Sequence, residues 1–139
     1  MIVIDASVVI TSLLPETDSE AARALIASEA CIAPDLIISE CVNALWKSVR
    51  LDRILPGEAE AALGAVTKLG VLLVPSGDLA GRALDLAIAL EHPAYDCFYL
   101  ALAETRGVEM VTQDGVFMRK VGAGRASIAT VRLLERGMS

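Results

Sequence analysis

Short apolar runs alternate with helix-forming segments along the whole chain. The runs at residues 1–5, 31–33, 71–74, 108–112 and 127–131 are predicted to be strands because they are short and continuous. The segments between them carry apolar residues at helical spacing and predict helices at residues 6–14, 19–28, 35–50, 58–69, 78–90 and 95–106. Strands that alternate with helices favour an α/β fold, in which a parallel β-sheet is flanked by helices on both faces.

Capping and turn residues set the expected ends of these helices. Asp18 or Ser19 is the expected N-cap of the second helix, and Asp35 that of the third. The Pro-Gly pair at residues 56–57 is expected to separate the third helix from the fourth. Gly70 is expected to end the fourth helix, as glycine commonly does.

The composition fits one folded domain. The chain has 139 residues, near the commonest domain size, and 55% of them are hydrophobic. No repeat, low-complexity stretch or linker divides it, so residues 1–139 are expected to form a single domain. The apolar start of the chain is too short to cross a bilayer and contains Asp5, which indicates a cytoplasmic protein without a membrane anchor.

The cysteines do not predict a metal site. Cys31, Cys41 and Cys97 lack paired ligand spacing, and His92 is the single histidine. A zinc site of thiolates and imidazoles is therefore hard to build, and buried reduced thiols are the simpler interpretation.

Charge is distributed unevenly. The net charge is −6, which argues against indiscriminate nucleic-acid binding. Residues 115–139 nevertheless have a balance of +4, from five basic residues against Glu135. These basic residues are Arg119, Lys120, Arg125, Arg132 and Arg136. They either hold a phosphate backbone beside an acidic pocket or simply form a solvated surface.

Four acidic residues stand at the edges of apolar or helix-forming segments: Asp5, Glu40, Asp96 and Asp114. Asp5 follows the first predicted strand directly, and Asp114 comes just after the strand at 108–112. Ligand sites of parallel sheets lie beyond the carboxyl ends of strands, so these two side chains converge if the strands are neighbours. Glu40 and Asp96 lie early in predicted helices and can point to the same edge. Such an oxygen-rich pocket suits a hard divalent cation such as Mg²⁺ or Mn²⁺.

Each carboxylate also has a simpler explanation. Asp5 could only cap the helix at 6–14, and Asp114 could only begin an Asp-Gly turn. Glu40 could be a solvated helix residue, and Asp96 could only stabilise the first turn of its helix. The metal-site hypothesis therefore depends on the set rather than on any one residue.

The sequence resembles the PIN-domain family of metal-dependent ribonucleases, and within it the VapC-like toxins of bacterial and archaeal toxin–antitoxin pairs. The resemblance runs end to end. Its strongest segments are MIVIDASVVITSLLPE, LIISECVNALWK, AYDCFYLALAE and VTQDGVF.

The resemblance implies a site, a reaction and partners. Asp5, Glu40, Asp96 and Asp114 match the family's acidic metal-binding, catalytic quartet. Thr112 matches a hydroxyl that orients the first aspartate, and Ser7 and Asn43 match supporting polar positions. The family pattern implies a three-layer α/β/α fold and a Mg²⁺- or Mn²⁺-dependent endoribonuclease, with products that carry a 5′-phosphate and a 3′-hydroxyl. It also implies a homodimer and a small antitoxin that covers the active site.

Two other functions compete with this one. A phosphatase or phosphoacceptor domain also gathers aspartates at strand ends, but Ser7 stands where the phosphatase would have its second aspartate. A receiver domain would follow its central strand with an aspartate, whereas the strand at 71–74 leads to Pro75. A non-catalytic protein that uses the pocket only to hold RNA or a partner is the second alternative.

Overall fold

A five-stranded parallel sheet organises the protein. The structure is a computed structural model that describes residues 1–135. The strands are β1 (Ile2–Ile4), β2 (Cys31–Pro34), β3 (Leu72–Val74), β4 (Met110–Thr112) and β5 (Val131–Leu133). Their order in the sheet is β3-β2-β1-β4-β5, and every neighbouring pair is parallel. The predicted α/β fold with a parallel sheet is confirmed.

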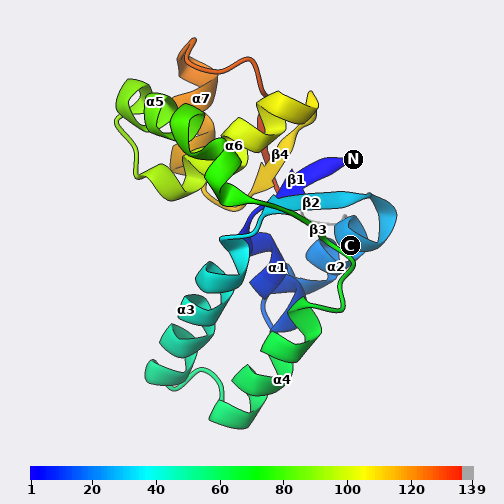
Figure 1. Cartoon of the computed structure of the whole chain (residues 1–139). Coiled ribbons are helices and arrows are strands. Elements are labelled where there is room, and N and C mark those ends of the chain that lie inside the picture. The colour runs from blue at the N-terminus through cyan, green and yellow to red at the C-terminus, as the bar shows by residue number, and fades with distance from the viewer. Residues whose placement is uncertain (136–139) are drawn as a thin grey trace.

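Helices cover both faces of this sheet. On one side lie α1 (Ala6–Leu13), α2 (Ser19–Ser28), α3 (Ile37–Arg50) and α4 (Pro56–Val66), and on the other α5 (Ala80–Leu90), α6 (Ala94–Arg106) and α7 (Gly115–Ala123) (Figure 1). A short 3-10 helix, η1 (Ser76–Leu79), precedes α5. The molecule is therefore a three-layer α/β/α sandwich.

The core lies where β1 and β4 meet α6. All three residues of each strand are buried, as an inner strand of a parallel sheet requires. In α6, Tyr99 and the four residues after it are 0% exposed. Five consecutive buried residues cover every side of a helix, so this central part of α6 lies inside the domain rather than on its surface. The carboxyl ends of β1 and β4 are therefore held in a rigid setting.

The predicted N-cap of the third helix was wrong. Asp35 does not cap α3, whose N-cap is Leu36. Instead, the Asp35 carboxylate accepts hydrogen bonds from the backbone N and Oγ of Ser76, at 3.0 and 2.6 Å. Asp35 therefore ties the end of β2 to the segment after β3, a long-range contact that local sequence does not encode.

Other boundaries moved by a few residues. Helix α4 begins at Pro56, because proline fits the first turn of a helix, where its missing N–H is not needed. It ends at Val66, and Gly70 follows in the connection with a φ of 75°. The last strand lies at Val131–Leu133 rather than at 127–131, and α7 was not predicted.

The three cysteines are buried thiols, as predicted. Cys31, Cys41 and Cys97 are free and buried. Burial raises the pKa of the Cys41 thiol to about 12 and that of the Cys97 thiol to about 11, which keeps both protonated. Within residues 1–135, no helix has the length and apolar character needed to cross a membrane.

Candidate active site

The strand order creates a crevice at the carboxyl end of β1. The chain passes from β1 to β2 and β3 on one side, and then returns to place β4 on the other side of β1. Ligands of open α/β sheets bind at such a switch point, outside the carboxyl ends of the strands. Asp5 follows β1 directly, and Asp114 lies two residues beyond the end of β4.

The four predicted carboxylates meet in this crevice. Asp5, Glu40, Asp96 and Asp114 line one cavity of about 300 Å³, together with Ala6, Ser7 and Gln113. Glu40 lies in the first turn of α3 and Asp96 in the first turn of α6. Four segments far apart in sequence thus bring their carboxylates to one place.

Asp5 is the most tightly held of the four. Its side chain is buried, and its Oδ1 accepts hydrogen bonds from Ser7 Oγ at 2.5 Å and Val8 N at 3.1 Å. Its Oδ2 accepts a hydrogen bond from Thr112 Oγ1. Burial raises the pKa of Asp5, and the nearby Asp96 charge raises it further, against the lowering effect of these hydrogen bonds. Asp5 is thus the N-cap of α1 and a member of the cluster at once.

Thr112 couples the two aspartates that follow the strands. Besides donating to Asp5, its Oγ1 accepts a hydrogen bond from the backbone N of Asp114 at 3.0 Å. Asp114 in turn caps α7, because its Oδ1 accepts from Phe117 N at 3.0 Å. The hydroxyl predicted to orient the first aspartate is therefore in contact with it.

Glu40 is fixed by a residue that the sequence did not single out as functional. The phenol of Tyr99, which is fully buried, donates a hydrogen bond of 2.6 Å to Glu40 Oε1. Burial raises the pKa of Glu40, and the charges of Asp96 and Asp5 act in the same direction. The available sequence signal was the i, i+3 spacing of Asp96 and Tyr99, which places both residues on one side of α6.

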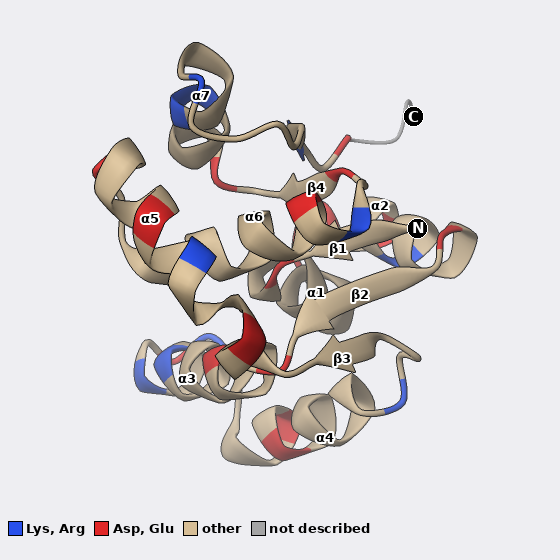
Figure 2. Cartoon of the chain, turned by 45° about the horizontal axis from the view of Figure 1, so that its top comes forward, with Lys and Arg blue, Asp and Glu red and all other residues tan. Residues whose placement is uncertain are grey.

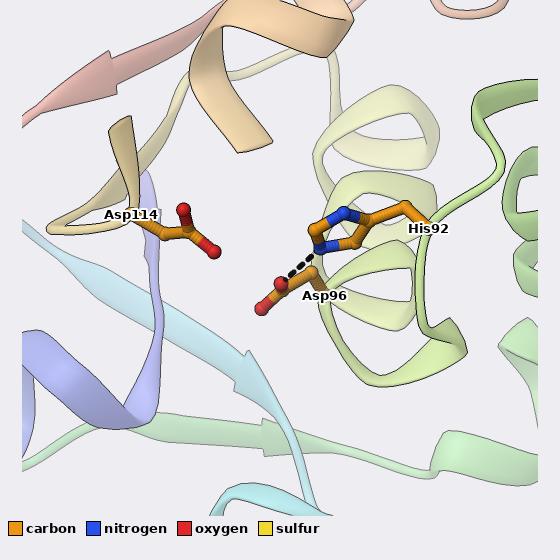
Figure 3. Close-up of side chains that lie close together, drawn as sticks. All are labelled: His92, Asp96 and Asp114. Atoms are coloured by element: carbon orange, nitrogen blue, oxygen red, sulfur yellow. Dashed lines mark hydrogen bonds and ion pairs between the residues drawn. The ribbon is translucent and has the colours of Figure 1, made fainter. Parts of the chain in front are cut away.

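Asp96 contacts His92, and this contact was not predicted either. The imidazole Nε2 lies 2.6 Å from Asp96 Oδ2, and the two residues are separated by one turn across the start of α6. Figure 3 shows both side chains directed toward the carboxylate of Asp114. One ligand atom from each of the three lies within 4.8 Å of the others. The i, i+4 spacing around Pro93 was the available signal.

The supporting positions divide into two groups. Ser7 and Thr112 contact Asp5 directly, as described above. Asn43 is exposed one turn beyond Glu40 and does not line the cavity.

Comparison with known proteins places this arrangement in a family. The family model for the PIN domain matches residues 2–123. The chain belongs to the PIN domain family.

Several relatives span most of this PIN domain. Ribonuclease VapC9 of Mycobacterium tuberculosis is 35% identical over 114 residues, which cover 82% of this chain and 86% of the relative. Exonuclease VapC9 of Pyrobaculum aerophilum is 36% identical over 100 residues, 70% of this chain and 73% of the relative. The crystal structure of VapC20 of M. tuberculosis, described as a sarcin–ricin loop cleaving toxin, has a TM-score of 0.69. It is 18% identical to this chain, and the match covers 89% of this chain and 95% of that one.

The donor set of this PIN domain fits a hard divalent cation. The cavity presents carboxylate oxygens, which Mg²⁺ and Mn²⁺ prefer, and no thiolate lines it within the described part of the chain. Two of its carboxylates, Asp5 and Glu40, have raised pKa values because they are buried near like charges. A bound dication would remove that electrostatic cost, so the residues present suit the metal that the resemblance implies.

Proposed function

We propose that this PIN domain is a metal-dependent endoribonuclease and the toxin of a toxin–antitoxin pair. The observation that carries the proposal is the convergence of Asp5, Glu40, Asp96 and Asp114 on one cavity. Relatives at 31–36% identity are called ribonucleases or an exonuclease, which supports nuclease chemistry. We also propose that residues 1–139 form a single domain, which agrees with the continuous sheet and core.

Each residue has a proposed role in holding the cation and the nucleophile. Asp5 and Asp96 are the proposed direct ligands, and Glu40 and Asp114 either bind through water or orient the attacking water. Ser7 and Thr112 fix the rotamer of Asp5. When bound, Mg²⁺ or Mn²⁺ activates water and neutralises charge on the phosphate and the leaving oxygen. We propose products with a 5′-phosphate and a 3′-hydroxyl.

Helix α3 offers a path for the RNA backbone that compensates for the acidic net charge. Lys47 lies two turns beyond Glu40 on the same face of α3, and Lys47, Arg50 and Arg53 are exposed. Figure 2 shows basic positions, in blue, along α3. The Arg50 guanidinium lies 5.5 Å from the centre of the Trp46 ring, which is 56% exposed. Cations beside an exposed aromatic ring suit a phosphate backbone and a stacked base.

The basic C-terminal segment is less available for RNA than its composition indicated. Arg132 pairs with Glu109 at 3.3 Å, and Lys120 contacts His92 and the carbonyl of Glu91. Arg136 lies outside the described residues.

We propose two protein partners. A small antitoxin would cover the acidic cavity with a basic side chain, and a second copy of this chain would form a homodimer. One structure with the same fold is a toxin–antitoxin complex from Klebsiella pneumoniae. Co-expression with a small protein encoded beside this gene should give a stable complex that inhibits cleavage. Absence of both the complex and the inhibition would contradict the proposed antitoxin.

RNA cleavage tests the enzyme proposal. Purified protein should cleave a structured RNA pool, such as tRNA, in Mg²⁺ or Mn²⁺ and not in EDTA. Asp96→Asn should be inactive although its unfolding curve shows a folded protein. An endonuclease gives a few discrete fragments from a circular or end-blocked RNA, whereas an exonuclease leaves such RNA intact. Metal binding without any cleavage would favour the non-catalytic RNA- or partner-binding alternative.

A further inference from the structure

His92 occupies an unusual position between α5 and α6. The preceding residue, Glu91, is the C-cap of α5 and has a left-handed backbone with φ 50° and ψ 50°, a conformation that is costly for a side chain such as glutamate. The backbone N of His92 then donates to the carbonyl of Ala87 at 3.2 Å, and Pro93 follows as the N-cap of α6. A strained residue maintained beside a cluster of carboxylates indicates that the position of His92 matters.

The contacts of the imidazole fix which nitrogen carries the proton. Its Nδ1 lies 3.3 Å from Lys120 Nζ, and the same ammonium donates to the carbonyl of Glu91 at 3.0 Å. An ammonium has only donors, so Nδ1 must be an acceptor and the proton must be on Nε2. Nε2 therefore donates to Asp96 Oδ2, 2.6 Å away. The ring of Phe117 packs against the imidazole with centroids 4.6 Å apart.

In this arrangement Nε2 of His92 is a hydrogen-bond donor to Asp96 and not a ligand for the cation. A ring nitrogen binds a metal through its lone pair, but the nitrogen that faces Asp96 is protonated. His92 is near enough to Asp96 and Asp114 for all three to reach one ion, yet its hydrogen bond leaves it the role of donor. Asp96 Oδ2 is thereby held, and Oδ1 remains for a cation.

We propose that His92 is a positioning residue for Asp96, that Lys120 fixes its tautomer, and that the pair keeps this site an all-oxygen site for a hard cation. The inference rests on the proposed role of Asp96 as a metal ligand. Lys120 lies on α7, the helix that Asp114 caps, so the contact also couples the two carboxylates.

The tautomer can be measured directly because His92 is the only histidine of the chain. In metal-free protein labelled with ¹⁵N-histidine, a long-range ¹H–¹⁵N spectrum at neutral pH should show one imidazole with its proton on Nε2. The same tautomer should persist after Mg²⁺ is added. A proton on Nδ1, alone or together with one on Nε2, would overturn the assignment.

Metal affinity tests the positioning role without using activity. Loss of a residue that orients a metal ligand weakens binding about 10- to 100-fold. By Mn²⁺ titration calorimetry, His92→Leu should lose affinity to this extent, whereas His92→Gln, whose amide can still donate to Asp96, should regain most of it. Equal affinity in wild type and His92→Leu would refute the role, as would equal losses in both variants.

Two controls separate this inference from the proposed function. Unfolding curves of the metal-free variants identify any variant that fails to fold, and Lys120→Met supplies a second test that leaves His92 in place. Lys120→Met should allow a proton on Nδ1, and an unchanged spectrum would refute the role of Lys120. If wild type binds Mn²⁺ with this tautomer but cleaves no RNA, the function fails while the positioning role stands.

Discussion

Thr112 provides a quantitative test of how the site is built. Its side chain is 0% exposed. Its hydroxyl donates a hydrogen bond to Asp5 Oδ2 and accepts one from the backbone N of Asp114. Thr112→Val preserves the shape of the side chain and removes both hydrogen bonds. A hydrogen bond to a charged group contributes about 1.5–3 kcal/mol, and a buried donor left unpaired costs about 1–3 kcal/mol. Asp114 is only half-buried, so water offsets part of the second cost, and we expect a loss of about 3 kcal/mol.

Thr112→Ser is the matched control. It keeps the hydroxyl and removes one buried methyl group, which contributes about 0.8 kcal/mol. Urea unfolding of the metal-free proteins should therefore rank wild type first, Thr112→Ser second and Thr112→Val last. Thr112→Val should also weaken Mn²⁺ binding, because the Asp5 rotamer is no longer fixed. If Thr112→Val is as stable as Thr112→Ser, the hydroxyl does not have the role that its contacts indicate.

Burial, surface charge and backbone strain each give a further prediction. Burial raises the pKa of Asp5 and Glu40 above 3.8 and 4.5, so the folded state holds these protons more tightly than the unfolded state. Their contribution to stability is complete below the ordinary pKa and is lost as pH rises through the raised one. The urea concentration at which metal-free protein unfolds should therefore fall as pH rises above these ordinary pKa values. It should fall less steeply in Asp5→Asn. A free energy of unfolding that rises with pH in this range would contradict the expectation. Lys47→Glu should weaken RNA binding several-fold in a filter assay and leave Mn²⁺ affinity unchanged, and equal RNA affinity would exclude α3 from the path. Glu91→Gly should raise the unfolding free energy by roughly 0.5–1 kcal/mol, because glycine adopts its left-handed backbone without strain; a destabilised variant would refute the strain.

The sequence predicted the parts of the molecule whose signals are local. Short apolar runs gave the strands near their true positions, and Asp5 and Asp114 were placed at strand ends that the structure brings together. A helix cap was the simpler alternative for Asp5 and an Asp-Gly turn was that for Asp114, yet each aspartate both caps a helix and lines the cavity. A carboxylate at a helix N-terminus at the edge of a sheet can do both, because the backbone N–H groups occupy only part of its oxygen lone pairs.

Contacts between segments that are far apart in the chain could not be predicted from the sequence. Aspartate is a common N-cap residue, but the hydrogen-bond partner of Asp35 is Ser76, which lies in the segment after β3. His92 was considered only as a zinc ligand, and its contact with Lys120 depends on α7, which the sequence did not predict. Tyr99 was not singled out as a site residue, although its hydroxyl donates to Glu40.

In our proposal the carboxylates at the switch point of the sheet together form a site for a divalent cation. Anomalous diffraction from crystals soaked in Mn²⁺ tests it most directly, with Asp96→Asn crystals as the control. We expect an anomalous peak in the cavity, within coordination distance of Asp5 and Asp96, that disappears in the variant. A well-ordered cavity without such a peak, or a peak that persists in Asp96→Asn, would contradict the claim.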